Sequence, residues 1–424
     1  MTLDDGAMFD PVEPIARGPR RRLLAALVGL VVLAAVIVVV AVVADDDDSP
    51  GGRDAQPTPT PTQTTPTDEP DPEPSEPGRL ISRSAFTTAV PSTVRAWRIV
   101  YSTTDAKGRP DTATATVLAS KDRPDGPRPV VGVGHGTVGL ASRCAPSLSQ
   151  QPFTGAVTAL ATLVSEGWVA VTTDYAGLGT PGMHPFLVGK SEAHNVLDAV
   201  RAAHEVLDLS PKTLLMGHSQ GGHAALWAGI EAPAYAPKLD VIGVAATAPA
   251  SDLYDLLTTT RGLIGGTLVE MLVLHAWERI YPEAKLGRQV GSRAASVLDQ
   301  AGRLCLFGSE GSQLFGLARS VVGETVPESA YDGELGRLLR ANTPSARIAA
   351  PVLVAQGLAD VLVPPGVQEA WVAKQCAAGQ EIDYREYDGQ THTSLVLPSS
   401  PLIDQLVQWA QDRLAGKPAR GNCG

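Results

Sequence analysis

The chain has 424 residues, 44% of them hydrophobic and 19% charged, so it is long enough to bury a sizeable core. Its net charge of −11 comes mostly from one acidic segment, residues 45–78, which carries ten Asp or Glu residues and one Arg. The remainder is close to neutral and has no basic stripe, which argues against a nucleic-acid-binding protein.

An uninterrupted apolar segment, residues 23–44, lies near the N-terminus. At about 1.5 Å per residue it spans roughly 33 Å as a helix, enough to cross a membrane. Four arginines lie in residues 1–22 and four aspartates follow the segment, so the positive-inside rule predicts a cytoplasmic tail and an extracytoplasmic remainder. We therefore predict a single-pass anchor in the cell membrane. The alternative is a cleaved signal peptide and a secreted protein, although signal peptides usually have apolar cores of about 7–15 residues.

Residues 45–78 hold nine prolines and a Pro-Thr run, with acidic residues at both ends. Such a composition buries almost no apolar surface and favours an extended chain. We predict a disordered stalk here, followed by a folded domain over residues 79–424.

Apolar runs typical of strands alternate with helical patterns in the folded domain. The first two runs alternate polar and apolar residues, which favours an opening antiparallel pair, whereas later runs are typical of buried parallel strands. The predicted strands are 95–103, 112–120, 129–134, 168–175, 213–217, 241–248, 351–357 and 381–387. The predicted helices are 156–165, 191–209, 221–230 and 402–414.

Residues 250–349 interrupt this alternation with helical patterns and no convincing strand. The chain therefore predicts an α/β fold, a mostly parallel central sheet flanked by helices, with a helical cap inserted at about 250–349. Apolar residues of the insert recur at near-helical spacing, and they could line an acyl tunnel or form the ordinary underside of a cap. They are Leu253, Leu256, Leu257, Leu263, Ile264, Leu268, Met271, Leu272 and Trp277.

The segment Gly217-His218-Ser219-Gln220-Gly221 has the pattern G-x-S-x-G between a predicted strand and a predicted helix. That context is typical of a nucleophile elbow, a turn so tight that side chains at the flanking positions would clash. The elbow lifts the serine hydroxyl clear of the sheet at a helix N-terminus, where developing negative charge is stabilised. We predict Ser219 as a nucleophile.

A serine nucleophile needs a histidine base and an orienting carboxylate, in the chain order serine, acid, histidine. His392 is the only histidine after residue 275, and it follows the last predicted strand. Asp360 follows the preceding strand and a glycine turn, so it is the predicted acid. Asp388 and Asp383 are the rival acids, each with the alternative role of a solvated surface carboxylate.

The oxyanion of a tetrahedral intermediate needs two backbone N–H donors. Gln220 follows the nucleophile and supplies one by position. The second is expected from the glycine-rich loop after strand 129–134, with Thr137 the first choice and Gly136 the second. A plain glycine-rich turn is the alternative interpretation of that loop.

The four cysteines all lie in the predicted exported part, which favours two disulfides. Three connectivities are open, and we favour Cys144–Cys305 with Cys376–Cys423. No Cys or His spacing is typical of a metal site, and no cofactor is implied. The histidines beside the elbow, His218 and His223, are expected to pack or hydrogen-bond locally.

Taken together, these motifs resemble the secretory lipase family of α/β-hydrolases, which includes fungal triacylglycerol lipases and bacterial relatives. The most distinctive are CAPS at residues 144–147 and D-Y-x-G-x-G at 174–179, around the serine motif and helical insert. The resemblance covers roughly residues 80–420. One departure is the glycine-rich loop GHGTVG at 134–139, where fungal members carry bulkier residues, so the identity of the oxyanion donor and the fungal substrate preference do not transfer directly.

The resemblance implies the α/β-hydrolase fold, a cap over an acyl-binding site and two disulfides. It also implies Ser219, Asp360 and His392 as a catalytic triad, with Gln220 in the oxyanion hole. The expected activity is that of a triacylglycerol lipase or carboxylesterase on a lipid or acyl ester. An envelope acyltransferase using the same triad is the first alternative, and a catalytically silent surface-binding protein is the second.

Overall fold

The computed structural model describes residues 76–122, 126–149 and 159–423. The predicted tail and membrane anchor, and the stalk up to residue 75, lie outside these residues. Across the part of the chain that the structure describes, no helix has both the length and the apolar composition needed to cross a membrane. The last residues of the predicted stalk, 76–78, are bonded to the folded domain, since the amide of Gly78 donates to the carbonyl of Ser102 at 2.7 Å.

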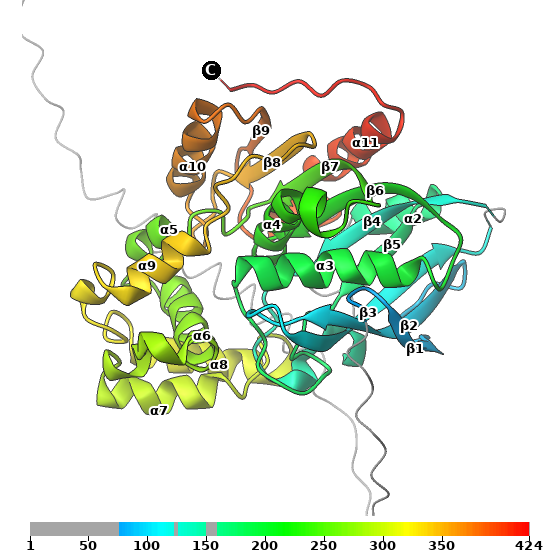
Figure 1. Ribbon diagram of the computed structural model, residues 1–424. Helices are drawn as coiled ribbons and strands as arrows, with labels where there is room; N and C mark the ends of the chain where they lie inside the picture. The colour runs from blue at the N-terminus through cyan, green and yellow to red at the C-terminus, as the bar shows by residue number, and fades with distance from the viewer. Residues whose placement is uncertain (1–75, 123–125, 150–158, 424) are drawn as a thin grey trace, which may run out of the picture. The chain divides into compact units, whose positions relative to one another are not determined.

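The described residues form one nine-stranded sheet with the order β1-β2-β3-β5-β4-β6-β7-β8-β9 (Figure 1). The pairs β1–β2, β2–β3 and β3–β5 are antiparallel. The other five pairs, which run from β5 across β4, β6, β7 and β8 to β9, are parallel. The strands are β1 Leu80–Ala85, β2 Val94–Thr104, β3 Pro110–Ser120, β4 Arg128–Gly134, β5 Val169–Thr173, β6 Leu209–His218, β7 Asp240–Thr247, β8 Val352–Gly357 and β9 Ile382–Tyr387.

Two layers of helices cover the sheet. Helices α3 (Gly189–Ala203), α4 (Gln220–Tyr235) and α10 (Pro365–Ala377) pack on one face, and α2 (Ala159–Ser165) and α11 (Leu402–Leu414) pack on the other. Because both faces are covered, the central strands are apolar throughout: every residue of β5 and β8 is buried. The mostly parallel sheet flanked by helices is thus present as predicted.

Several element boundaries differ from the sequence prediction by a few residues, and α4 continues to Tyr235, five residues past its predicted end. The boundary between α3 and β6 has an identifiable cause. Helix α3 ends at Ala203, not at 209, because residues 204–207 turn back and donate to carbonyls of the helix end. Strand β6 begins at Leu209, four residues before the predicted start. Leu207 packs against the same core cluster as α3. It therefore continues the apolar pattern of the helix past Ala203, so the pattern in the sequence does not indicate where α3 ends.

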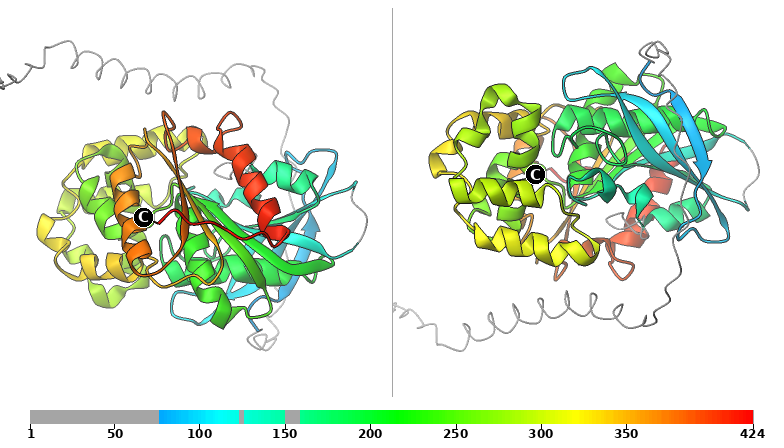
Figure 2. Two further views of the ribbon diagram at one scale, coloured as in Figure 1. Left: turned by 90° about the horizontal axis from the view of Figure 1, so that it is seen from above. Right: turned by 90° about the horizontal axis from the view of Figure 1, so that it is seen from below.

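The segment between β7 and β8 is helical and gathers at one end of the sheet (Figures 1 and 2). Its α-helices are α5 Leu253–Thr259, α6 Ile264–Ile280, α7 Ser292–Ala301, α8 Gly311–Ser320 and α9 Glu334–Ala341. Of the nine apolar residues singled out in the sequence, seven are buried, and Leu263 and Ile264 are exposed. The buried ones belong to a cluster formed largely by the cap itself, which favours core packing over an acyl tunnel for them.

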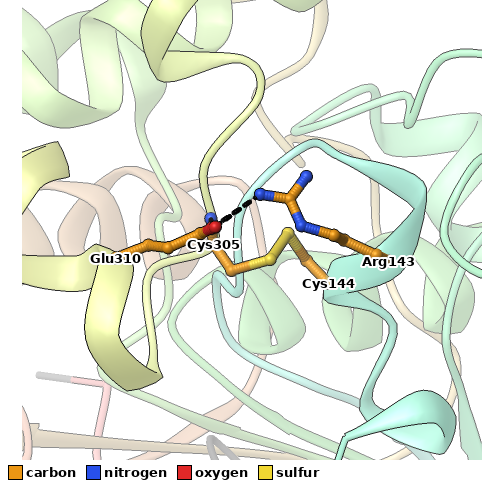
Figure 3. Close-up of a disulfide and its surroundings, with 4 residues drawn as sticks. All are labelled: Arg143, Cys144, Cys305 and Glu310. Atoms are coloured by element: carbon orange, nitrogen blue, oxygen red, sulfur yellow. Dashed lines mark hydrogen bonds and ion pairs between the residues drawn. A yellow bond between two sulfur atoms is a disulfide. The ribbon is translucent and has the colours of Figure 1, made fainter. Parts of the chain in front are cut away.

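The two disulfides join Cys144 to Cys305 and Cys376 to Cys423, the pairing favoured from the sequence. The first connects the loop after β4 to the cap, as Figure 3 shows. The second connects α10 to the C-terminal segment. Only the first disulfide therefore joins the cap to the sheet domain.

Candidate active site

Ser219 is the single residue between β6 and α4, with φ 58° and ψ −119°. A non-glycine residue adopts such a backbone only when its surroundings enforce it. The flanking glycines are part of that enforcement: a Cβ on Gly217 would lie 2.1 Å from the carbonyl oxygen of Gly221, and a Cβ on Gly221 would lie 1.9 Å from that of Gly134. The turn has the strained, glycine-flanked form expected of an elbow.

Backbone hydrogen bonds hold Ser219 at the carboxyl end of the parallel strands. Its amide donates to the carbonyl of Thr247, the last residue of β7, at 2.9 Å. Its carbonyl accepts from the amides of His223, at 3.1 Å, and Ala250, at 3.3 Å. The serine is half-buried, so it is fixed in position and still accessible.

Asp360 and His392 come from separate loops, after β8 and β9, and meet in a hydrogen bond. Nδ1 of His392 donates to Oδ2 of Asp360 at 2.7 Å. The other carboxylate oxygen accepts from the amides of Leu362, at 2.8 Å, and Val363, at 2.9 Å. Because the carboxylate only accepts, this geometry puts the ring proton of a neutral His392 on Nδ1 and leaves Nε2 free to take a proton.

His392 lies beside the elbow. Its ring centroid is 4.5 Å from that of His218, the residue before Ser219. Burial, with a contribution from His392, holds the pKa of His218 well below its usual value, so the His218 ring is neutral. Its Nδ1 donates to the carbonyl of Thr247 at 3.0 Å, which is the local hydrogen bonding expected from the sequence.

The two rival acids, Asp383 and Asp388, have surroundings different from those of Asp360. Asp383 pairs with Arg385 through two hydrogen bonds of 2.9 and 2.6 Å, and Asp388 is exposed. Of the three aspartates, Asp360 is the one hydrogen-bonded to His392.

The glycine-rich loop after β4 lies against the N-terminus of α4, since a Cβ on Gly221 would lie only 1.9 Å from the carbonyl oxygen of Gly134. Gln220 is the first residue of α4, so its amide has no partner within the helix. Thr137 is half-buried, and the carbonyl of Gly136 accepts from Nδ1 of His135 at 2.7 Å. The oxyanion roles of Gln220, Thr137 and Gly136 stay predictions.

The cap is fastened to the same loop by more than the disulfide. The amide of Leu306 donates to the carbonyl of Val138 at 2.8 Å, and Gly139 forms an antiparallel bridge with Cys305. Next to the disulfide, Arg143 pairs with Glu310 at 2.7 Å (Figure 3). A cap segment is thus bonded directly beside the predicted oxyanion donors.

We expect the double substitution of Cys144 and Cys305 by serine to lower kcat about tenfold to hundredfold, because small displacements of positioned groups are costly to rate. The chain-entropy model assigns about 5 kcal/mol to this 161-residue separation and about 4 kcal/mol to the 47-residue separation of Cys376 and Cys423. The matched control, Cys376→Ser with Cys423→Ser, should therefore lose similar stability and keep its kcat. Equal kcat in both double variants, measured below their unfolding temperatures, would contradict a positioning role for the first disulfide.

Sequence reasoning missed one group at this site. The carboxylate of Glu192, on α3, is fully buried and accepts from Nε2 of Gln220, the residue after the serine, at 2.8 Å. A glutamate beside the apolar face of an amphipathic helix gives no signal of burial, since solvated positions on helices carry the same residue. Among the residues that the structure describes, no group of His, Cys, Asp and Glu side chains could hold a metal ion.

Residues 153–422 match the sequence model of the secretory lipase family. Over 355 residues the chain is 27% identical to a probable inactive lipase of Mycobacterium tuberculosis, covering 79% of this chain and 77% of that protein. It is 25% identical to lipase 6 of Candida albicans, covering 77% and 74%. The solved structure of lipase A from Candida antarctica is similar with a TM-score of 0.68 at 20% identity, covering 82% and 84%, and this likeness shows the α/β-hydrolase fold.

Proposed function

Because the chain belongs to the secretory lipase family, we propose that it hydrolyses lipid or acyl esters through an acyl-enzyme on Ser219. The observation that carries the proposal is the 2.7 Å hydrogen bond between Asp360 and His392, on loops that bring the histidine ring beside the serine turn. The name of the Mycobacterium tuberculosis relative marks that protein as a probable inactive lipase. In this chain Ser219, Asp360 and His392 are all present, which supports an active enzyme.

In the proposed reaction, Nε2 of His392 takes the hydroxyl proton of Ser219 as the serine oxygen attacks the ester carbonyl. The amide of Gln220 and that of Thr137, or of Gly136, hold the resulting oxyanion. Asp360 keeps the Nδ1 proton in place and stabilises the imidazolium. The tetrahedral intermediate then expels the alcohol, which takes the proton from His392. Water, deprotonated by His392, attacks the acyl-enzyme to form a second tetrahedral intermediate. This intermediate expels the Ser219 oxygen, which takes the proton back from His392, and the carboxylic acid leaves.

The proposed substrate class, a lipid or acyl ester, is supported by the family more than by the cap. The apolar cap residues of the sequence prediction are mostly packed with one another, so they give no measure of acyl-chain length. Triacylglycerol lipase and carboxylesterase activity are therefore both within the proposal.

We further propose that the catalytic domain is extracytoplasmic. The family's secretory character and two disulfides support export, since disulfides persist in oxidising compartments. The predicted membrane anchor at residues 23–44 would keep the enzyme at the cell surface, and cleavage after this segment would release it. Cell fractionation with an antibody to the catalytic domain would distinguish these two forms.

The first experiment is an ester series. The full chain, expressed with disulfides allowed to form and purified in one detergent, should hydrolyse p-nitrophenyl esters between C2 and C16. An optimum at long chains would identify a lipase, and one at short chains a carboxylesterase. A folded chain that hydrolyses none of them would contradict the proposal.

An acyltransferase with the same triad is the second candidate, favoured by the predicted anchoring beside the envelope. Its acyl-enzyme would pass the acyl group to an alcohol in place of water. Adding acceptor alcohols to the ester assay separates the two, because a transferase forms the transfer ester at the expense of free acid. A catalytically silent binding protein would fail to react with a fluorophosphonate probe.

A further inference from the structure

A buried carboxylate lies behind the serine turn, and the proposed reaction does not use it directly. We propose that Glu192 is a positioning residue, which holds the Gln220 side chain and thereby orients the Gln220 amide toward the oxyanion. This inference rests on the proposed function and goes beyond the triad and the oxyanion donors.

The contacts of Glu192 account for both of its oxygens. Oε1 accepts from Nε2 of Gln220 at 2.8 Å and from the amide of Leu187 at 2.9 Å. Oε2 lies 2.8 Å from Nδ1 of His223, on the first turn of α4. The side chains of Glu192 and His223 are both fully buried. A buried carboxylate persists only when it is paired and hydrogen-bonded, and this one is.

The Glu192–His223 contact is a buried hydrogen bond that joins α3 to α4. The other ring nitrogen of His223, Nε2, lies 2.8 Å from the carbonyl oxygen of Asn342. A carbonyl only accepts, so Nε2 carries a proton and donates to Asn342. Nδ1 and Oε2 of Glu192 then share one proton, and their contact is a hydrogen bond whichever of the two groups holds that proton. The pair fastens α4 to α3 immediately after the elbow. Such a buried pair holds a geometry tightly, because removing one member leaves a polar group of the other buried without its hydrogen-bond partner.

Gln220 is held from a second side by His184. Its Nε2 lies 2.9 Å from Nε2 of His184, a fully buried ring. Burial, helped by the nearby His135, lowers the pKa of His184 to about 3, so this ring is neutral and its Nε2 can accept. Both amide hydrogens of Gln220 are therefore engaged, one by Glu192 and one by His184. A side chain fixed at both hydrogens restrains its own backbone, where the predicted oxyanion donor lies.

The same cluster reaches the end of the cap. Asn342 directly follows α9, the last cap helix, and its side-chain oxygen accepts from the amide of Gly189, the first residue of α3, at 3.0 Å. Nε1 of Trp227, on α4, donates to the Asn342 carbonyl at 2.9 Å. Glu192 and its partners thus hold three parts of the fold at one point: the elbow helix, the start of α3 and the exit from the cap.

Oxyanion donors act by being in place before the charge develops, so loosening one lowers the rate of the chemical step more than substrate binding. In the full chain, Glu192→Ala should lower kcat about 10- to 100-fold per fluorophosphonate-titrated serine, with KM within about threefold. The Ki of a trifluoromethyl ketone, which forms a hemiketal oxyanion on the serine, should rise by a similar factor. Glu192→Gln should recover most of the kcat, because its oxygen still accepts from Gln220 and its amide can donate to a neutral His223.

Asp198→Ala is the matched control, since Asp198 is also a fully buried carboxylate of α3 but bonds to Thr103, Tyr235 and Arg201. It should lose stability and keep kcat per titrated serine. If Glu192→Ala does not fold, Gln220→Met tests the same point, because it removes both side-chain hydrogen bonds and keeps the backbone amide.

The positioning role would be overturned if the variant measured, Glu192→Ala or Gln220→Met, had the wild-type kcat and Ki. That conclusion would hold even if the variant unfolded at a lower temperature. A folded wild-type chain that neither hydrolyses esters nor reacts with the fluorophosphonate would overturn the proposed function, and the inference with it. An active wild type with unaffected variants overturns the role of Glu192 alone.

Discussion

Replacing Ser219 by alanine is expected to lower kcat by about 10⁴- to 10⁶-fold, the range seen when a triad nucleophile is removed. The variant keeps the glycines that shape the turn, and alanine has the same backbone restrictions as serine at φ 58°. We therefore expect unfolding at nearly the wild-type temperature. The measurements are p-nitrophenyl ester hydrolysis, fluorophosphonate labelling and thermal unfolding of both proteins.

The control for this variant is Ser82→Ala, at an exposed position of β1, which should leave hydrolysis and labelling unchanged. Residual labelling at another serine would be found by digesting the labelled protein and identifying the modified peptide. If Ser219→Ala kept full esterase activity, Ser219 would not be the nucleophile, and the acyl-enzyme mechanism would have to be assigned to another residue.

Asp360→Asn is expected to lower kcat by about 10⁴-fold, because it reverses the hydrogen bonding of His392. One side-chain oxygen of Asp360 accepts from the amides of Leu362 and Val363, so the asparagine oxygen would keep that side. Its NH₂ group would then face Nδ1 of His392, which would have to accept. The ring proton would move to Nε2, which could no longer take the proton of Ser219.

Single variants of the rival acids provide the comparison for Asp360→Asn. Asp383→Asn removes an ion pair with Arg385, and Asp388→Asn changes an exposed side chain, so both should keep kcat within about twofold. The measurement is kcat per fluorophosphonate-titrated serine at neutral pH. A large loss in Asp388→Asn, with little loss in Asp360→Asn, would reassign the acid of the triad.

The three residues of the predicted triad could be chosen from local sequence patterns and chain order. The elbow was identifiable because glycine, serine and glycine at fixed spacing between a strand and a helix meet a local steric requirement, seen here in the close approaches of Gly217 and Gly221. Asp360 was identifiable from chain order and from its place after an apolar strand, and His392 from chain order and from its place after the last predicted strand. Their roles in catalysis remain proposals, to be decided by the variants above.

Two secondary-structure elements were missed or misplaced in the sequence prediction, each for an identifiable reason. The first strand, β1, was not predicted, because five of its six residues are exposed and its sequence LISRSA has no buried face to create a pattern. The end of α3 was misplaced because Leu207 continued the apolar periodicity into a turn.

By itself, the sequence determined the alternation of strands and helices, the helical character of the cap and the tight turn at Ser219. These properties depend on residues close together in the chain, whose backbone preferences and spacing are visible without a fold. Only the tertiary structure decided that Asp360 bonds to His392, that Val138 bonds to the cap at Leu306, and that Glu192 is buried against Gln220 and His223. These contacts join residues distant in sequence, and polar side chains such as Glu192 carry no local mark of the partner that will offset the cost of their burial.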